Sequence, residues 1–440
     1  MTTVCVVGGG AREHALAAVL GRSADVVATP GNPGIVGTTA EGHRLWSTAA
    51  PPSEIEADLF VIGPEAPLAD GLSDRLRAEG KLVFGPGADG ARIESSKIFM
   101  KHTASKAGVP TARHAVCGTI GEARAFLRSL PGPYVVKTDG LAAGKGVLVT
   151  DDLETAERDA AEKLSGSAFG DAGRRLVVEE ALFGPELSLL VVCDGRGAMA
   201  LLPAQDFKRA GDGDTGPNTG GMGAWSPVPI ATPALVDEAM DTIVEPTLLA
   251  LRRAGTDYRG VLYAGLIVTA EGPKLIEYNA RFGDPEAEVV LPLLASDLTE
   301  LLAAAAGGAL AEPPTFRPES AVCVVAAAAG YPASPRSGDL VEGVEEAGRV
   351  EGVTVFHAGT RRDSSGALRS AGGRVLAVTA LGETVAEARS RAYEGLGHIR
   401  MEGMHFRRDV AGASSFEMSL AVGETGASPQ SPHSSPGHPR

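Results

Sequence analysis

Residues 134–150 read YVVKTDGLAAGKGVLVT, a glycine-rich loop with a central lysine between two apolar, β-branched runs. Glycine and lysine beside a strand are typical of a loop that closes over phosphate groups. A P-loop needs G-x-x-x-x-G-K-[ST] followed by a helix. Here three residues separate Gly140 from Gly144, Gly146 stands where Ser or Thr would hold magnesium, and a strand-like run follows. The stretch therefore predicts a hairpin that closes over ATP phosphates, with Lys137 and Lys145 as cations; an ordinary exposed hairpin is the alternative.

Composition narrows the class of protein. The chain has 440 residues, 44% of them hydrophobic and 22% charged, and a formal net charge of −15. This is ordinary for a globular protein of about three domains, and the negative charge argues against non-specific binding to nucleic acid. The four cysteines lack metal-type spacing, and no apolar run is long enough to span a bilayer. Because the first residues enter a strand pattern without a signal peptide, we expect a cytoplasmic protein.

Strand and helix patterns predict three domains and a tail. Residues 1–100 alternate short apolar runs with helical spacing, which predicts a parallel α/β domain. Helical patterns also cover 91–108 and 234–254, and residues 258–279 have the pattern of a hairpin. A Pro-rich linker at 311–319 leads into a small α+β domain, residues 313–412. Residues 413–440 are rich in Ser, Pro and Gly, which predicts disorder.

Residues 275–286, LIEYNARFGDPE, are the most informative stretch for chemistry. Glu277 and Asn279 are two apart in a predicted strand, so their side chains face the same side. Oxygen ligands on one face beside a triphosphate suit Mg²⁺, which takes few protein ligands and completes its octahedron with phosphate and water. Arg281 follows, where it could stabilise developing negative charge. A solvated polar face is the alternative.

Two motifs lie at strand ends in the first domain. GGGAREHAL (8–16) follows a strand and opens a helix, whose backbone N–H groups favour an anion, with Arg12 placed to help. Its sixth position is Glu13, so it departs from the dinucleotide fingerprint. GPEAPL (63–68) offers Glu65 to sugar hydroxyls. Taken alone, the motif at 8–16 is also compatible with a tight turn that binds no ligand. The motif at 63–68 is also compatible with a solvated glutamate in a turn.

Two more motifs lie in the central part of the chain. VVEEALFGPE (177–186) could present backbone groups to adenine and a carboxylate to ribose. QDFKRAGDGDTGPNTGGMG (205–223) is long, polar and glycine-rich, and long loops inside a domain are usually functional or disordered. Its candidates for substrate contact are Asp206, Lys208, Arg209 and Asn218.

These motifs occur together and in one order, which starts with SSK (95–97) and ends with IEYNARFGDPEAE (276–288). In this combination the chain resembles the phosphoribosylamine–glycine ligases, or glycinamide ribonucleotide synthetases, of the ATP-grasp superfamily. The resemblance covers roughly residues 1–410 and extends to VFHAGT (355–360) and GGRVLAVTALG (372–382). RFGDPE and DTGPNTGGMG are typical of this enzyme family rather than of ATP-grasp proteins at large.

The resemblance implies an N-terminal α/β domain, an ATP-grasp domain over 101–312 with a lid at about 113–184, and a C-terminal α+β domain. By likeness, the catalytic residues are Arg281 and Lys137, and the metal ligands are Glu277 and Asn279. ATP would contact Lys97, Lys137, Gly144, Lys145, Gly146, Glu179, Glu180, Ala181, Leu182 and Glu186. The other substrates would contact Gly9, Gly10, Ala11, Arg12, Glu65, Asp206, Lys208, Asn218 and Asp284.

The implied reaction joins glycine to 5-phosphoribosylamine in purine biosynthesis. Glycine's carboxylate attacks ATP to give glycyl phosphate and ADP, and the amine then displaces phosphate to form glycinamide ribonucleotide. ATP and Mg²⁺ (or Mn²⁺) are the expected cofactors, and the partners are small molecules, without nucleic acid or membrane. Transient contact with the amidotransferase that supplies the amine is allowed, and the chain could be a monomer or a homodimer. The alternatives are another ATP-grasp carboxylate–amine ligase, a nucleotide-dependent oxidoreductase, and an ATP-binding module without activity.

Two positions depart from the family pattern. Ala11 stands where relatives often have a second glycine before the arginine, which weakens the predicted anion loop. Residues 263–269 offer no acidic side chain on the strand that in many ATP-grasp relatives carries a third metal ligand. The sequence therefore leaves the number of metal ions open, because a second metal site would lack this ligand.

Overall fold

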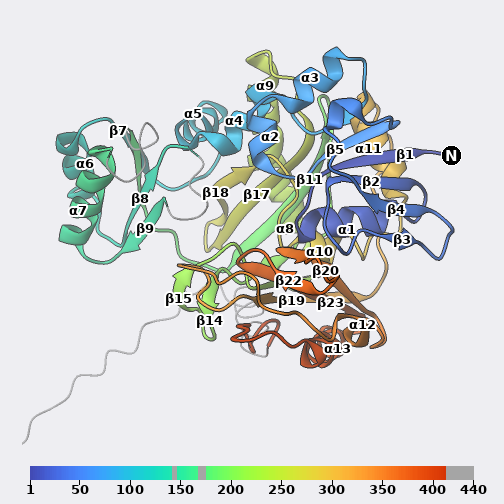
Figure 1. Cartoon of the computed structure of the whole chain (residues 1–440). Coiled ribbons are helices and arrows are strands. Elements are labelled where there is room, and N and C mark those ends of the chain that lie inside the picture. Colours follow the sequence, from blue (N-terminus) through green and yellow to red (C-terminus); the bar gives the residue numbers. More distant parts are fainter. Residues whose placement is uncertain (141–145, 167–174, 413–440) are drawn as a thin grey trace, which may run out of the picture.

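The computed structural model describes residues 1–140, 146–166 and 175–412 (Figure 1). Gly144 and Lys145, the predicted ATP contacts in the glycine-rich loop, lie outside the described residues, as does the tail 413–440. Within the described part, no helix has both the length and the apolar character needed to cross a membrane.

The N-terminal part forms a mostly parallel six-stranded sheet, as the sequence predicts. Its strands occur in the order β3-β4-β2-β1-β5-β6, and only β3 runs antiparallel to its neighbour. The strands are β1 (Thr3–Gly8), β2 (Asp25–Pro30), β3 (Gly37–Thr38), β4 (Arg44–Ser47), β5 (Leu59–Ile62) and β6 (Val83–Phe84). The helices are α1 (Ala11–Leu20), α2 (Glu65–Ala69), α3 (Leu72–Ala78), α4 (Ala88–Ser95) and α5 (Lys97–Ala107), with a 3₁₀ turn at Pro52–Glu54. Strand β5 is buried along its whole length, as expected where helices cover both faces of a parallel sheet.

A small unit projects to one side of the molecule in Figure 1 and corresponds to the segment predicted as the lid, the name kept for it below. Its antiparallel sheet has the order β7-β10-β8-β9. The elements are β7 (His114–Cys117), α6 (Ile120–Leu127), β8 (Tyr134–Thr138), β9 (Val147–Thr150), α7 (Leu153–Leu164) and β10 (Leu176–Glu180). Strands β8 and β9 pair on either side of the glycine-rich loop, which confirms the predicted strand–loop–strand arrangement.

The second half of the grasp fold is an antiparallel sheet in the order β12-β11-β17-β18. Its strands are β11 (Glu186–Asp194), β12 (Ala198–Ala200), β17 (Arg259–Thr269) and β18 (Gly272–Asn279). The predicted hairpin is present as the pair β17–β18. The associated helices are α8 (Pro233–Ala239), a π-helical turn (Met240–Val244), α9 (Glu245–Arg253), α10 (Ala287–Val290) and α11 (Leu298–Gly307).

The C-terminal sheet includes two strands from the middle of the chain, β13 and β16. Its order is β13-β16-β19-β23-β20, and β16 pairs antiparallel with β19. The strands are β13 (Gln205–Asp206), β16 (Gly223–Ser226), β19 (Ser320–Ala327), β20 (Val353–His357) and β23 (Arg374–Gly382), with helices α12 (Val344–Ala347) and α13 (Val385–His398). Two hairpins accompany them, β14 (Arg209–Gly211) with β15 (Thr215–Asn218), and β21 (Thr360–Arg362) with β22 (Leu368–Ser370). Segment 205–223 therefore carries strands, and the expectation of a long structureless loop is wrong.

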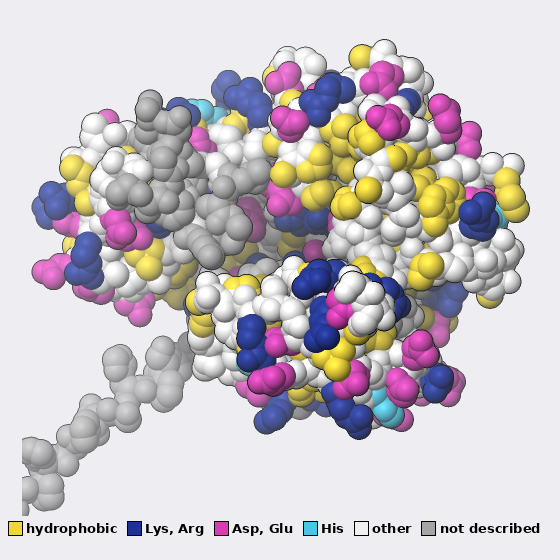
Figure 2. Space-filling model, in the orientation of Figure 1, with side chains coloured by type: hydrophobic (Ala, Val, Ile, Leu, Met, Phe, Trp, Pro, Cys, Tyr) yellow, Lys and Arg dark blue, Asp and Glu magenta, His cyan; other side chains and the backbone are white. Residues whose placement is uncertain are grey.

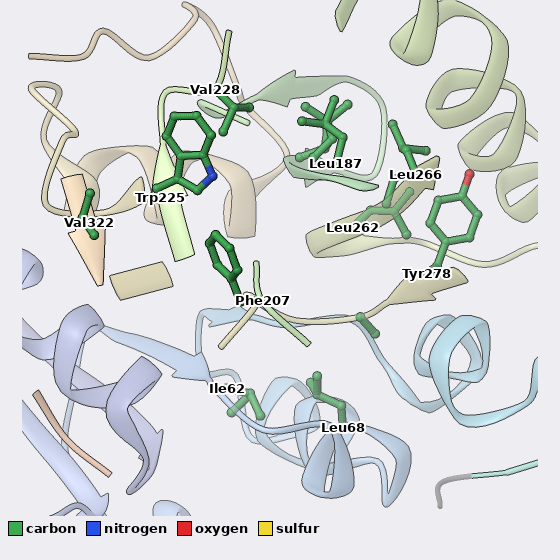
Figure 3. Close-up of a cluster of buried hydrophobic side chains, with 14 of the residues drawn as sticks. Ile62, Leu68, Leu187, Phe207, Trp225, Val228, Leu262, Leu266, Tyr278 and Val322 are labelled. Atoms are coloured by element: carbon green, nitrogen blue, oxygen red, sulfur yellow. The ribbon is translucent and has the colours of Figure 1, made fainter. Parts of the chain in front are cut away.

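One hydrophobic core joins the N-terminal sheet, the second grasp sheet and the C-terminal sheet. Figure 3 shows Ile62, Phe207, Trp225 and Leu262, which come from these different parts of the chain, in one cluster. The lid has a separate core, which includes Val136 and Val178. The lid is therefore stabilised by its own packing, whereas the other three sheets depend on each other.

One predicted helix is divided, and another contains a π-helical turn. The pattern over 91–108 is broken at Ser96, whose backbone is extended and whose hydroxyl accepts a hydrogen bond from the N–H of Phe99. Ser96 thus ends α4 and caps α5. The pattern over 234–254 is one continuous helical stretch with a π-helical turn in the middle, at Met240–Val244.

Candidate active site

A cavity of about 400 Å³ lies where the N-terminal domain, the lid and the second grasp sheet meet. The face in Figure 2 is hollowed between these parts and the C-terminal domain. Predicted site residues that line the cavity are Glu65, Lys97, Gly146, Asp206, Lys208, Glu277, Asn279, Arg281 and Asp284. Motifs that are up to about 220 residues apart are therefore brought to one place.

Strand β18 delivers the two predicted metal ligands. Glu277 and Asn279 both line the cavity, as their spacing predicts. The amide oxygen of Asn279 accepts a hydrogen bond of 3.3 Å from Arg281 Nη2. Among the residues that the structure describes, no hydrogen bond or ion pair engages the Glu277 carboxylate. An unpaired carboxylate beside an amide oxygen suits a hard cation such as Mg²⁺, so the donor set fits the expected metal.

Arg281 is held by two carboxylates from the N-terminal part of the chain. Its Nη2 atom lies 3.1 Å from Glu94 Oε1, and its Nε atom lies 3.4 Å from Glu65 Oε2. Glu94 Oε2 also accepts the backbone N–H of Ala280 at 2.7 Å. Burial raises the pKa of Glu94, and the positive charge of Arg281 offsets part of this increase. The sequence reading missed Glu94, although it immediately precedes the SSK motif.

Lys137 lies on β8 within a buried ion triad. Its Nζ atom is 3.1 Å from Glu179 Oε2 on β10, and Lys101 Nζ is 3.2 Å from Glu179 Oε1. Burial lowers the pKa of Lys101 to about 8. Burial alone would raise the pKa of Glu179, but Lys137 and Lys101 keep it below its usual value. Glu179 was expected beside adenine; its carboxylate is instead the counter-ion of both lysines.

The other residues predicted at the hinge do not line the cavity. None of Glu180, Ala181 and Leu182 lines it, and Glu180 Oε1 accepts the backbone N–H of Arg113 at 2.9 Å. Glu186, expected at ribose, forms an ion pair with Lys208.

The 205–223 segment contributes Asp206 and Lys208 from the side of the C-terminal sheet. Lys208 Nζ lies 2.8 Å from Asp206 Oδ1. Burial would lower the pKa of Lys208, but Asp206 and Glu186 raise it well above its usual value, so the lysine is charged. Asn218 lies on β15, is exposed, and does not line the cavity.

The helix start expected to bind an anion is already occupied by a side chain. Glu13 Oε2 accepts the N–H of Gly10 at 2.6 Å, and Glu13 Oε1 accepts from Arg12 Nε at 2.6 Å. Arg12 also donates to the carbonyl of Phe282 at 3.1 Å and is only 7% exposed. Ala11 is buried as well, while Gly9 and Gly10 are partly exposed. The Glu13 carboxylate fills the space that a dinucleotide pyrophosphate would need, which argues against the oxidoreductase alternative.

The small antiparallel unit, the antiparallel grasp sheet and the oxygen-bearing side chains of β18 in the cavity between them define the protein as an ATP-grasp enzyme. Three models of phosphoribosylglycinamide synthetase match in succession, the N domain at residues 2–94, the ATP-grasp domain at 95–287 and the C domain at 321–413. The chain belongs to the phosphoribosylamine–glycine ligase family.

Individual relatives are similar over nearly their full length. The phosphoribosylamine–glycine ligase of Streptomyces coelicolor is 50% identical, covering 93% of this chain and 98% of the relative. That of Caulobacter vibrioides is 48% identical, covering 93% and 97%. The crystal structure of the Thermotoga maritima enzyme is similar with a TM-score of 0.81 at 35% identity, covering 93% of this chain and 100% of that one. The biotin carboxylase domain of a Hydrogenobacter thermophilus enzyme has a TM-score of 0.66 at 15% identity and shares the fold.

Proposed function

We propose that this chain joins glycine to 5-phosphoribosylamine with ATP, through glycyl phosphate, to give glycinamide ribonucleotide, ADP and phosphate. Family membership supports this activity. The observation that carries it is the pattern of charges in the cavity. Among the described cavity-lining residues, Glu277 and Lys97 are the charged side chains without a hydrogen bond or ion pair, so one anion is free for a metal and one cation for phosphate.

The reaction needs activation because a carboxylate oxygen is a poor leaving group. Glycine's carboxylate attacks the γ-phosphorus of ATP, and ADP leaves. The amine of phosphoribosylamine then attacks the acyl carbon, the carbon–oxygen bond to phosphate breaks, and the amine loses a proton. Positioning and neutralisation of charge supply most of the catalysis in such phosphoryl transfers.

The protein's own residues divide this work. Lys97 and Lys137 bind ATP phosphates, and Arg281 stabilises charge on the transferred phosphoryl group. Glu65 binds the ribosyl substrate, and Asp206, Lys208 and Asp284 are substrate contacts. Glu277 and Asn279 would hold Mg²⁺ or Mn²⁺, which would neutralise phosphate charge when bound. The cytoplasmic location, the oligomeric state and contact with an amidotransferase stay predictions from the sequence.

The test measures ADP release with ATP and Mg²⁺ while glycine and phosphoribosylamine are omitted in turn. Release that depends on both, with glycinamide ribonucleotide as the product, is expected. A different amino acid or amine that supports faster release would favour the alternative carboxylate–amine ligase. Glu277→Ala should abolish turnover, and Glu271→Ala, in the turn of the same hairpin, should not, because the Glu271–Lys274 pair is exposed. Unimpaired ligation by Glu277→Ala would refute the metal assignment.

A further inference from the structure

The C-terminal domain places one arginine against two residues that line the cavity. Arg374, the first residue of β23, forms an ion pair of 3.0 Å between its Nη2 atom and Asp284 Oδ2. Its Nη1 atom donates to the carbonyl of Asp284 at 2.8 Å and to the carbonyl of Gly220. Asp284 and Gly220 both line the cavity, so Arg374 connects two of its walls. The Arg374 side chain is still 21% exposed.

The glycines of the NTGGMG motif are needed for this contact. A Cβ on Gly220 would lie 3.0 Å from Arg374 Cζ, and a Cβ on Gly221 would lie 2.4 Å from Pro285 Cδ. The hydroxyl of Tyr331 accepts the N–H of Gly220 at 2.9 Å, so the C-terminal domain binds both polar groups of this glycine. The arrangement therefore keeps a guanidinium close against the cavity wall.

The ribosyl substrate carries a phosphate. The start of helix α1, which the sequence predicts as the phosphate-binding site, is already in contact with the Glu13 side chain. The N–H of Gly10 is bonded to Glu13, and Arg12 is buried against Glu13 and Phe282. Of the three cations that line the cavity in the described part of the chain, two have more carboxylate partners than Arg374, which pairs there with Asp284 alone, and the third has another role. Arg281 is paired with two glutamates and Lys208 with two carboxylates, and Lys97 is assigned to ATP. A phosphate beside Glu65 and Asp284 needs a further positive charge.

We propose that Arg374 binds the phosphate monoester of the ribosyl substrate, so that the C-terminal domain selects phosphorylated over unphosphorylated sugars. This inference rests on the proposed function. Arg374 lies beside Asp284, a predicted substrate contact, and its planar fork suits a phosphate. Lys and Arg side chains gather along the edge of the C-terminal domain that faces the hollow, near β20 and β22, which favours approach of an anion (Figure 2).

The experiment compares two amines formed in place from ammonia, one from ribose 5-phosphate and one from ribose. The readout is the ratio of kcat/KM for the phosphorylated amine to that for ribosylamine. Arg374→Gln should lower this ratio roughly 10- to 100-fold, because a charge-assisted hydrogen bond to the phosphate is lost. kcat/KM for ribosylamine should change less than about threefold. Arg349→Gln, in the same domain with a side chain 74% exposed, is the matched control and should leave the ratio unchanged.

A partial reaction separates this inference from the proposed function. Hydroxylamine traps glycyl phosphate as a hydroxamate and carries no phosphate, so its formation should be equal in the native protein and in Arg374→Gln. An absence of hydroxamate with the native protein would refute the proposed function itself. Equal losses for both amines and for hydroxamate would show that Arg374 only supports Asp284 and Gly220, and an unchanged ratio would refute the proposal directly. If Arg374→Gln does not fold, Arg374→Lys is judged by the same ratio, with a smaller decrease expected.

Discussion

The Glu179 ion triad gives a prediction that follows from buried charges. Glu179 is 3% exposed and is the shared counter-ion of Lys101 and Lys137, which lie on α5 and in the lid. Glu179→Gln keeps the size of the side chain and removes its charge. Two buried lysines then lose their common carboxylate, and Lys137 loses the contact that fixes the direction of its ammonium group, which we propose binds the ATP phosphates.

The stability lost in Glu179→Gln follows from the burial of the ion triad. Removing one partner of a buried ion pair costs about 3–5 kcal/mol, and we expect about 3 kcal/mol because glutamine can still accept one hydrogen bond. The lid has its own core, so the loss should appear in the unfolding of the lid. For a unit of about 60–100 residues, each kcal/mol lowers Tm by about 4–8 °C, so the lid transition should fall by roughly 12–24 °C.

Scanning calorimetry and KM for ATP are the measurements. Glu162→Gln is the matched control, since it makes the same change at an exposed position of α7 and should stay within about 0.5 kcal/mol of the native protein. KM for ATP should rise in Glu179→Gln and not in the control. If the two variants unfold at the same temperature with the same KM, the triad is not an energetic unit and the reasoning fails.

Three further predictions concern other parts of the molecule. Glu94→Gln should lower kcat about 10- to 100-fold in the ADP-release assay, because Arg281 loses a charged partner, and native turnover would contradict that role. Burial lowers the pKa of His14 to about 3 and of His357 to about 4, so the unfolded chain, with a histidine pKa of about 6.5, binds more protons between pH 6.5 and 4. Stability should therefore fall as pH falls through this window, by up to about 1.4 kcal/mol per pH unit for each histidine, and His14→Gln should have a shallower slope in urea unfolding at pH 7 and pH 5. Gly184→Ala should cost roughly 1–3 kcal/mol in urea unfolding, since its φ is +145° and its Cβ would lie 2.1 Å from a carbonyl of β17; a neutral effect would contradict the strain.

Local patterns predicted most of the secondary structure. Apolar runs such as Leu59–Ile62 became strands at the predicted residues, and the two strands around the glycine-rich loop pair as expected. The sheet that combines β13 and β16 with β19 was not predictable, because the partners are about 100 residues apart and short strands carry little periodic signal. The break at Ser96 was readable in principle, since serine is a preferred helix cap.

The residues of the candidate site also differ in whether the sequence predicts them, and this difference has a physical cause. Glu277 and Lys97 were named from their motifs, and within the described part of the chain they are the cavity-lining charges without a hydrogen bond or ion pair. Glu94 and Arg374 were missed, and each is paired with a residue 90 or more positions away. Glu277 and Lys97 lie in short local motifs, whereas Glu94 and Arg374 are specified by partners that only the fold brings near. Glu13 shows the opposite case. The motif around it predicts a free anion-binding site at the helix start, and the Glu13 carboxylate itself accepts the Gly10 N–H there. Motifs therefore identify the residues available to ligands, and contacts between domains determine which of those residues stay available.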